Sequence, residues 1–281
     1  MKFINTKELR QIQLSILNEI HKFCEENEIN YVLAFGSLIG AIRHDGYIPW
    51  DDDIDIAMPR KDYEIFFKIF QSNRYAAMNY KNSKDYPYPY GKVYDSMTVM
   101  QENINIKQET GVYIDVFPVD GISNNIKEHK KQIKKMQYYR YVLNLKRHKA
   151  RKDDILLLKF LKTIIYMALR PVVLFYSYKN LIGKIDFLSK KYKYEESSNV
   201  MILPTSMPNK LNDYVLQTDI TKRLLHTFEE YYFYIPEGYD KWLTNLYGNY
   251  MQLPPESKRE VHHEFVAYWK EDNSIKLNLS K

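Results

Sequence analysis

Asp51-Asp52-Asp53-Ile54-Asp55-Ile56 is the stretch that decides the fold, and it follows shortly after Phe35-Gly36-Ser37. Its four carboxylates repel one another, so a chain seldom gathers them without a counter-charge. In an extended segment alternate residues share a face, which places Asp51, Asp53 and Asp55 together and turns the isoleucines the other way. Such a row favours a hard cation with oxygen ligands, Mg²⁺ first and Mn²⁺ second. A solvated acidic turn is the alternative, but it would have no reason to bury every second residue.

The composition describes a folded and mildly basic protein. The chain has 281 residues, of which 45% are hydrophobic, and this is enough for a sizeable core. Lys and Arg number 41 against 35 Asp and Glu, and the net charge of +6 suits anionic ligands or an anionic membrane surface. The excess does not by itself indicate nucleic acid. Cys24 is the only cysteine, which excludes an intrachain disulfide and a cysteine-based zinc site and favours a reducing, cytoplasmic environment.

Hydrophobic spacing and turn residues predict alternating helices and strands up to about residue 124. The expected helices are one capped by Thr6 and running past residue 23, and two more at residues 38–43 and 62–70. The expected strands are residues 31–35, 54–58, 75–80, 90–100 and 111–118. Asp120, just past Pro118, is expected in a turn. Residues 125–192 are predicted to be helical and basic, and the remainder is mixed.

The Gly-Ser pair and the aspartates form one constellation, because a short helix separates them. Glycine lets the backbone approach a phosphate, the start of a helix binds anions, and Ser37 adds a hydroxyl. This order, with Asp53 and Asp55 on the next strand, resembles the nucleotidyltransferase-fold enzymes. Such a site needs a third carboxylate on a neighbouring strand. Asp115, which lies inside an apolar run, is the candidate. The alternative is that Asp115 lies at the end of a strand and its side chain bonds only to the backbone.

Three further residues are candidates for binding a substrate, either at its phosphates or at an alcohol attached to them. Arg43 follows Ser37 by six residues, so that it could neutralise a phosphate or be a surface salt-bridge partner. Lys92 lies in a strand-like run and could contact phosphate, although a strand lysine is more often solvated. Trp50 abuts the acidic stretch, and Tyr86, Tyr88 and Tyr90 alternate nearby, so aromatic rings could hold a quaternary ammonium by cation–π contact.

Residues 36–55 resemble the first sequence block of the LicD/fukutin family, and residues 111–121 and 246–255 resemble its later blocks. The resemblance covers roughly residues 10–120 and 225–270. It implies an α/β (α+β), nucleotidyltransferase-like fold with a mixed sheet flanked by helices and a helical, basic insertion. Animal members carry a cysteine-based zinc site, which a chain with one cysteine lacks, so the chain resembles the bacterial branch.

The resemblance also implies an activity. We expect a Mg²⁺-dependent transfer of phosphocholine from CDP-choline to a sugar hydroxyl of a teichoic acid, lipopolysaccharide or capsule precursor, with release of CMP. Asp53, Asp55 and Asp115 would be catalytic, the metal ligands would be these three and Asp51, and Gly36, Ser37, Arg43, Lys92 and Trp50 would bind the donor. The alternatives are another CDP-linked alcohol such as glycerol or ribitol, a nucleotidyltransferase using CTP or ATP, and a scaffold without catalysis.

The domain organisation is expected to be a single catalytic domain, residues 1–281, with three parts. These are a nucleotidyltransferase-like core at residues 1–124, a helical basic insertion at residues 125–192 and a completing part at residues 193–281. A helix predicted at residues 155–178 is apolar with a basic stripe, and it either packs on the core or lies on an anionic membrane. Because the glycan acceptor is expected to be lipid-linked, the location expected is cytoplasmic, at the inner face of the plasma membrane.

Overall fold

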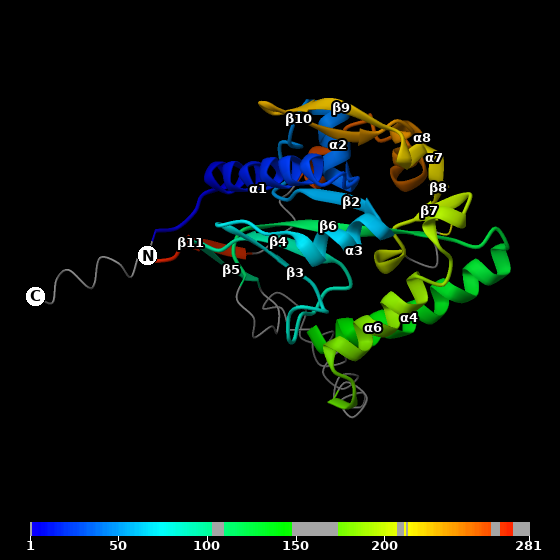
Figure 1. Cartoon of the computed structure of the whole chain (residues 1–281). Coiled ribbons are helices and arrows are strands. Elements are labelled where there is room, and N and C mark those ends of the chain that lie inside the picture. Colours follow the sequence, from blue (N-terminus) through cyan, green and yellow to red (C-terminus); the bar gives the residue numbers. More distant parts are fainter. Residues whose placement is uncertain are drawn as a thin grey trace, which may run out of the picture.

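A mixed sheet forms the centre of the computed structural model, which describes residues 2–102, 110–147, 174–206, 211, 213–259 and 265–271 (Figure 1). Its strands run in the order β1 (Val32–Leu33), β2 (Asp55–Pro59), β6 (Tyr113–Gly121), β4 (Gly91–Asp95) and β3 (Tyr75–Met78). β7 (Asn199–Met201) pairs with the end of β6 and with β8 (Val215–Leu216). β2 and β6 are parallel, whereas the other pairs are antiparallel. The predicted mixed α/β sheet is therefore present.

Three helices in the first quarter of the chain pack around this sheet: α1 (Thr6–Glu26), α2 (Phe35–His44) and α3 (Arg60–Ile69). α1 buries the apolar positions that its spacing predicted, including Leu9, Ile16 and Ile20. Its cap is Asn5 and not Thr6, because the Asn5 side chain accepts a hydrogen bond from the Glu8 amide at 2.9 Å. The remaining elements of the core extend the same apolar cluster toward the C-terminal part.

A second, smaller apolar cluster lies under the helix pair α4 (Ile126–Arg147) and α6 (Tyr178–Ser189). Ile133 and Met136 of α4 face Leu181, Ile182 and Ile185 of α6, and all five are fully buried. The helical prediction for residues 125–192 is confirmed over these two helices. Residues 155–173 of the predicted helix at 155–178 lie outside the described residues. Among the helices that the structure describes, none has the length and apolar character needed to cross a membrane.

The C-terminal part adds one hairpin, one strand that pairs with β5, and short helices. β9 (Arg223–Phe228) pairs with β10 (Tyr231–Pro236), and α7 (Gln217–Thr221) and α8 (Tyr239–Tyr247) flank this hairpin. Three 3₁₀ turns lie at Tyr194–Glu196, Leu203–Thr205 and Glu256–Lys258. β11 (Phe265–Trp269) pairs with β5 (Thr98–Glu102), and residues 2–4 bond to the same β11, since Ile4 donates to Ala267 and Trp269 donates to Lys2, both at 2.9 Å. Segments from the two ends of the chain thus share one small sheet.

The strand predictions hold to within a few residues, except that residues 90–100 form parts of two strands, β4 and β5, which belong to different sheets. Two further corrections concern aspartates. The predicted strand at 54–58 begins one residue later, so Asp51, Asp52 and Asp53 precede it in a loop. Asp120 lies in β6 and not in a turn.

Arg60 explains the second correction. Its guanidinium donates to both carboxylate oxygens of buried Asp120, at 2.7 and 2.6 Å, and this pairing satisfies the charge. On one side of β6, the pairing with β4 ends at Val116 and the pairing with β7 begins at Asp120. Pro118 lies between these two pairings, where a strand needs no N–H donor on that side.

Candidate active site

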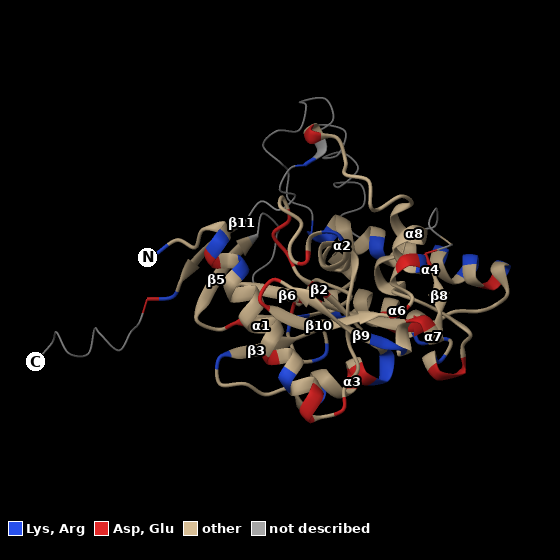
Figure 2. Cartoon of the chain, turned by 90° about the horizontal axis from the view of Figure 1, so that it is seen from above, with Lys and Arg blue, Asp and Glu red and all other residues tan. Residues whose placement is uncertain are grey.

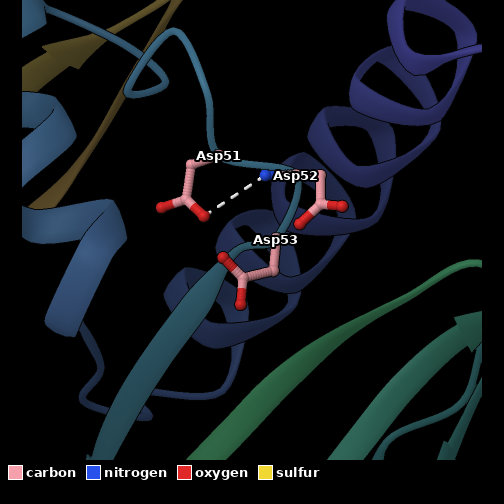
Figure 3. Close-up of side chains that lie close together, drawn as sticks. All are labelled: Asp51, Asp52 and Asp53. Atoms are coloured by element: carbon pink, nitrogen blue, oxygen red, sulfur yellow. Dashed lines mark hydrogen bonds between the residues drawn. The ribbon is translucent and has the colours of Figure 1, made fainter. Parts of the chain in front are cut away.

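A loop of three consecutive aspartates leads into β2 and forms a compact acidic cluster (Figure 3). Asp51, Asp52 and Asp53 each offer a carboxylate oxygen, and these oxygens lie within 4.8 Å of one another. Asp51 and Asp53 are half-buried, whereas Asp52 is buried and its amide donates to Asp51 Oδ1 at 3.3 Å. An extended segment would place Asp51, and not Asp52, on the same face as Asp53, and for this reason Asp51 was predicted as a metal ligand. In the loop that assumption fails, and all three carboxylates converge.

Side chains of helix α1 donate hydrogen bonds to the backbone carbonyls of this loop. Arg10 Nη2 donates to the Asp51 carbonyl at 2.6 Å and to the Pro49 carbonyl at 2.9 Å. Gln13 Nε2 donates to the Asp52 carbonyl at 2.9 Å, and Tyr47 Oη donates to Gln13 Oε1 at 3.1 Å. The acidic cluster is therefore preorganised by contacts from another element. Sequence reasoning missed Arg10 and Gln13, because nothing distinguishes them from other polar residues of an amphipathic helix.

A row of charged side chains crosses the sheet next to this loop. Asp55 of β2 is in register with Asp115 of β6, which is in register with Lys92 of β4. Residues in register share a face of the sheet. Lys92 Nζ lies 2.8 Å from Asp115 Oδ1, and the lysine is only 1% exposed. The predicted third carboxylate therefore stands on the strand beside Asp55, and the alternative of a solvated Lys92 is wrong.

The carboxylates disturb one another electrostatically. The pKa of Asp55 is raised well above its ordinary value, first by burial and then by the charges of Asp53, Asp115 and Asp51, with Lys92 acting in the opposite direction. Each carboxylate added to a half-buried site makes ionisation of the others more costly. A bound cation would remove this cost, and the donor set is made of oxygen atoms of the kind that Mg²⁺ accepts.

The Gly36-Ser37 turn touches the acidic loop directly. A Cβ atom on Gly36 would lie 2.6 Å from Asp51 Oδ2, so a larger residue here would push this carboxylate out of its position. Ser37 is buried, and its Oγ accepts a hydrogen bond from the Asp55 amide at 2.8 Å. The helix α2 begins here with Ala34 as a cap that has no side-chain hydrogen bond. The turn thus joins the start of α2, the loop and the start of β2.

Arg43 and Trp50 lie at the other end of α2, beside the C-terminal segment. Arg43 Nη1 donates to the Tyr250 carbonyl at 2.5 Å, and its Nε contacts His44 Nε2 at 2.9 Å. Arg259 stacks over the ring of half-buried Trp50 at 5.4 Å. Burial, and after it the charge of Arg259, lowers the pKa of Arg43. Together the two guanidinium groups make a basic edge near the acidic loop.

Tyr247, in α8, is a further residue of the site that sequence reasoning did not single out. Its pKa is raised by burial and by the negative charges of Asp55, Asp51 and Asp53 and of Asp213, so its hydroxyl lies near the acidic cluster. The signal that could have found it is its place in the C-terminal block at residues 246–255. Among the predicted aromatic residues, Tyr86 is buried and the Tyr88 ring centroid lies 4.4 Å from the Lys92 ammonium. The ring of Tyr113, which was not predicted, lies 3.1 Å from the same ammonium.

Carboxylates on two adjacent parallel strands, with a Gly-Ser turn at the preceding helix, define a nucleotidyltransferase-like domain. The family described as "LicD/FKTN/FKRP, nucleotidyltransferase domain" matches residues 28–155 of the chain. The chain is 28% identical over 272 residues to the "Lipopolysaccharide cholinephosphotransferase LicD" of Haemophilus influenzae, a match that covers 95% of this chain and 99% of that protein.

Shorter stretches of the chain are similar to two further proteins. The "Mannosyltransferase regulator 4" of Saccharomyces cerevisiae is 30% identical over 122 residues, which cover 40% of this chain and 10% of the yeast protein. An uncharacterized protein of Rickettsia typhi is 34% identical over 71 residues, or 25% of this chain and 23% of that protein.

Proposed function

We propose that the protein transfers phosphocholine from CDP-choline to a sugar hydroxyl of a cell-surface glycan precursor and releases CMP. The observation that carries this proposal is the carboxylate set at the start of β2 and on β6, in a chain that matches a cholinephosphotransferase over nearly its full length. The chain is a transferase by family. The choice of donor and of acceptor is the part that needs experiment.

Mg²⁺ is the cofactor that suits the site. Asp51, Asp53, Asp55 and Asp115 supply oxygen ligands, and the raised pKa of Asp55 indicates a site with too much negative charge for its burial. When bound, the metal would neutralise the donor pyrophosphate and stabilise negative charge on the phosphoryl oxygens. Asp52 lies close enough to assist through a bound water, although its backbone is what Gln13 holds.

The chain's own residues have separate tasks in this proposal. The basic edge of Arg43 and Arg259 attracts the donor phosphates toward the acidic loop. Asp115, which Lys92 holds in one orientation, accepts the proton of the attacking sugar hydroxyl. The new bond joins the sugar oxygen to the phosphorus that bears choline, and the bond from this phosphorus to CMP breaks.

A lysine-rich face on α4 and α6 suits a second role, contact with an anionic membrane. Exposed lysines line it, with Tyr138 52% and Phe187 78% exposed among them, and a groove of about 1200 Å³ runs between the helices. The lysines of this face are Lys127, Lys130, Lys131, Lys134, Lys135, Lys179 and Lys184. Basic side chains mixed with exposed rings favour binding to anionic lipid head groups. We place this lysine face on the inner leaflet, where a lipid-linked acceptor would be reached.

The proposal is tested by incubating the purified protein and Mg²⁺ with radiolabelled CDP-choline and a membrane fraction as acceptor. Label should appear in the glycan and CMP in solution, in equal amounts. Labelled CDP-glycerol, CDP-ribitol, CTP and ATP are compared in parallel. Release of pyrophosphate from CTP or ATP, without transfer from CDP-choline, would replace the proposal with a nucleotidyltransferase reaction.

A further inference from the structure

An aromatic pocket of about 430 Å³ opens beside the acidic cluster, between the start of α2, the sheet and α8. Its lining includes five aromatic side chains and one carboxylate: Phe35, Tyr90, Phe117, Trp242, Tyr247 and Asp213. A volume of this size accommodates a small ligand group. Neither the metal ligands nor the basic edge described above uses this pocket.

Three of the rings form one wall of the pocket. Phe117 stands in the middle, with Phe35 edge-on at 5.1 Å and Tyr90 tilted against it at 4.4 Å between ring centroids. Trp242 is buried in the lining, and Tyr247, 45% exposed, stands at the mouth. The ring positions are fixed by packing, so the wall offers π-faces without a cost of ordering them.

The backbone at Phe35 supports a functional reason for this wall. Phe35 has a φ of 47°, in the left-handed region that is unfavourable for a bulky side chain. Such a conformation persists only where the surrounding structure holds it, and it is found disproportionately at ligand sites. It places the Phe35 ring against Phe117, directly before the Gly36-Ser37 turn.

The pocket continues the charged row along the same face of the sheet. Phe117 follows Asp115 by two residues in β6, so both side chains point to one face, about 6.6 Å apart along the strand. Tyr90 immediately precedes β4, which carries Lys92. Tyr247 is near Asp51, Asp53 and Asp55 as well as Asp213. A phosphate held at the carboxylates would therefore direct a two-carbon arm into the pocket.

The lining selects for a particular ligand chemistry. Aromatic faces and a carboxylate favour a cation, and the apolar walls favour a cation covered by methyl groups. The buried Ser206 hydroxyl in this lining already donates to the Leu203 carbonyl at 2.9 Å. A polyol, a primary ammonium or a cytosine ring must replace the hydrogen bonds to water that it loses on entry, whereas a trimethylammonium group makes none.

We infer that this pocket binds the trimethylammonium group of the donor and so selects choline over other CDP-linked alcohols. The inference rests on the proposed function, because it assigns a subsite within the same reaction. Tyr247 and Asp213 are the residues that test it, since both lie in the lining and Tyr247 is partly exposed.

The experiment measures kcat/KM with CDP-choline, CDP-ethanolamine and CDP-glycerol for the parent, Tyr247→Leu and Asp213→Asn. Removing one ring or the carboxylate should lower the preference for CDP-choline over CDP-glycerol roughly tenfold, the size expected of one cation–π contact. Tyr232→Leu is the matched control, because Tyr232 is 63% exposed on β10. This control should leave the ratio unchanged. Equal losses with all three donors would overturn the inference, since a merely structural role affects them alike.

A binding measurement separates this inference from the proposed function. Phosphocholine, glycerol phosphate and CMP are titrated by calorimetry with Mg²⁺ present. Phosphocholine should bind more tightly than glycerol phosphate, and Tyr247→Leu should remove this difference while leaving CMP binding within twofold. A loss confined to CMP would show that the pocket holds the base, and the inference would be overturned. If the parent releases no CMP from any CDP-alcohol, the proposed function fails, whereas selective phosphocholine binding would still support the pocket.

Discussion

The acidic cluster and the lysine face show two opposite ways to use charge. At the acidic cluster, Lys92 is buried against Asp115, and Arg10 and Gln13 hold the loop by its carbonyls. On the lysine face the charges are solvated and are set along two helices, and α4 shows as blue turns in Figure 2. The same figure shows red ribbon close to α2, where the acidic loop lies. Charges that are held in place can position a reacting group. Solvated charges are screened and attract a partner mainly through its total charge.

The largest effect that would distinguish the two regions is the loss of enzymatic activity when a residue of the acidic cluster is replaced. Asp53→Asn should lower CMP release about a thousandfold or more, because a metal ligand is removed where charge develops on the phosphoryl group. The readout is CMP release from CDP-choline, with circular dichroism to show that the fold is kept. Asp85→Asn is the control, since Asp85 is exposed and its φ of 61° suits asparagine. Full activity in Asp53→Asn would reject the site.

Replacing a fixed cation should cost stability, and replacing a solvated one should not. Lys92→Met leaves Asp115 half-buried without its counter-charge, and we expect about 3 kcal/mol of destabilisation in urea unfolding. Lys131→Met, on the lysine face, should change the free energy of unfolding by less than about 0.5 kcal/mol. If the two variants unfold at the same urea concentration, the contrast between the regions does not hold.

The lysine face should affect membrane binding alone. Lys130→Gln with Lys134→Gln removes two charges, worth about 1 kcal/mol each at an anionic surface, so partition onto phosphatidylglycerol vesicles should fall roughly thirtyfold. Lys222→Gln with Lys241→Gln removes two exposed lysines elsewhere and should change it much less. Co-sedimentation at two salt concentrations gives the measurement. Equal binding by parent and Lys130/Lys134 variant would remove the membrane role.

The smallest effect is a pH dependence of stability without metal. Because the pKa of Asp55 is raised in the folded protein, the folded state binds more protons than the unfolded state between the ordinary and the raised value. Stability at this site is therefore greatest at low pH and is lost as the pH rises through the folded pKa. The slope is at most about 1.4 kcal/mol per pH unit. Urea unfolding in EDTA should show it in the parent, and Asp55→Asn should reduce it. If the free energy of unfolding of the parent and of Asp55→Asn depends on pH in the same way, the raised pKa of Asp55 is contradicted.

Local patterns in the sequence predicted much of the site, because residues 36–56 are close in the chain. A helix and a strand there suffice to bring Ser37 and Asp55 together, as their 2.8 Å hydrogen bond confirms. Asp115 was found because a carboxylate in an apolar strand is unusual.

Other parts depend on long-range register, which a single sequence does not reveal. The pairing of Lys92 with Asp115 and of Arg60 with Asp120 joins segments far apart. Lys92 was therefore predicted to contact phosphate, with a solvated side chain as the alternative, and Asp120 was predicted in a turn. Arg10 gives no local signal, and Tyr247 is marked only by its place in the block at residues 246–255. The assigned roles of the site residues, the metal and the three-part division of the chain stay predictions.

The small sheet of β5, β11 and residues 2–4 has a consequence for synthesis. Trp269 Nε1 donates to Glu8 Oε1 at 2.9 Å across a separation of 261 residues. Contacts of such separation close the largest loop of the chain, and they form late. While the ribosome is still translating, residues 2–4 lack the β11 backbone to which they bond in the folded protein. The nascent chain can build its catalytic sheet first, and it ties this early segment down only after Trp269 has emerged.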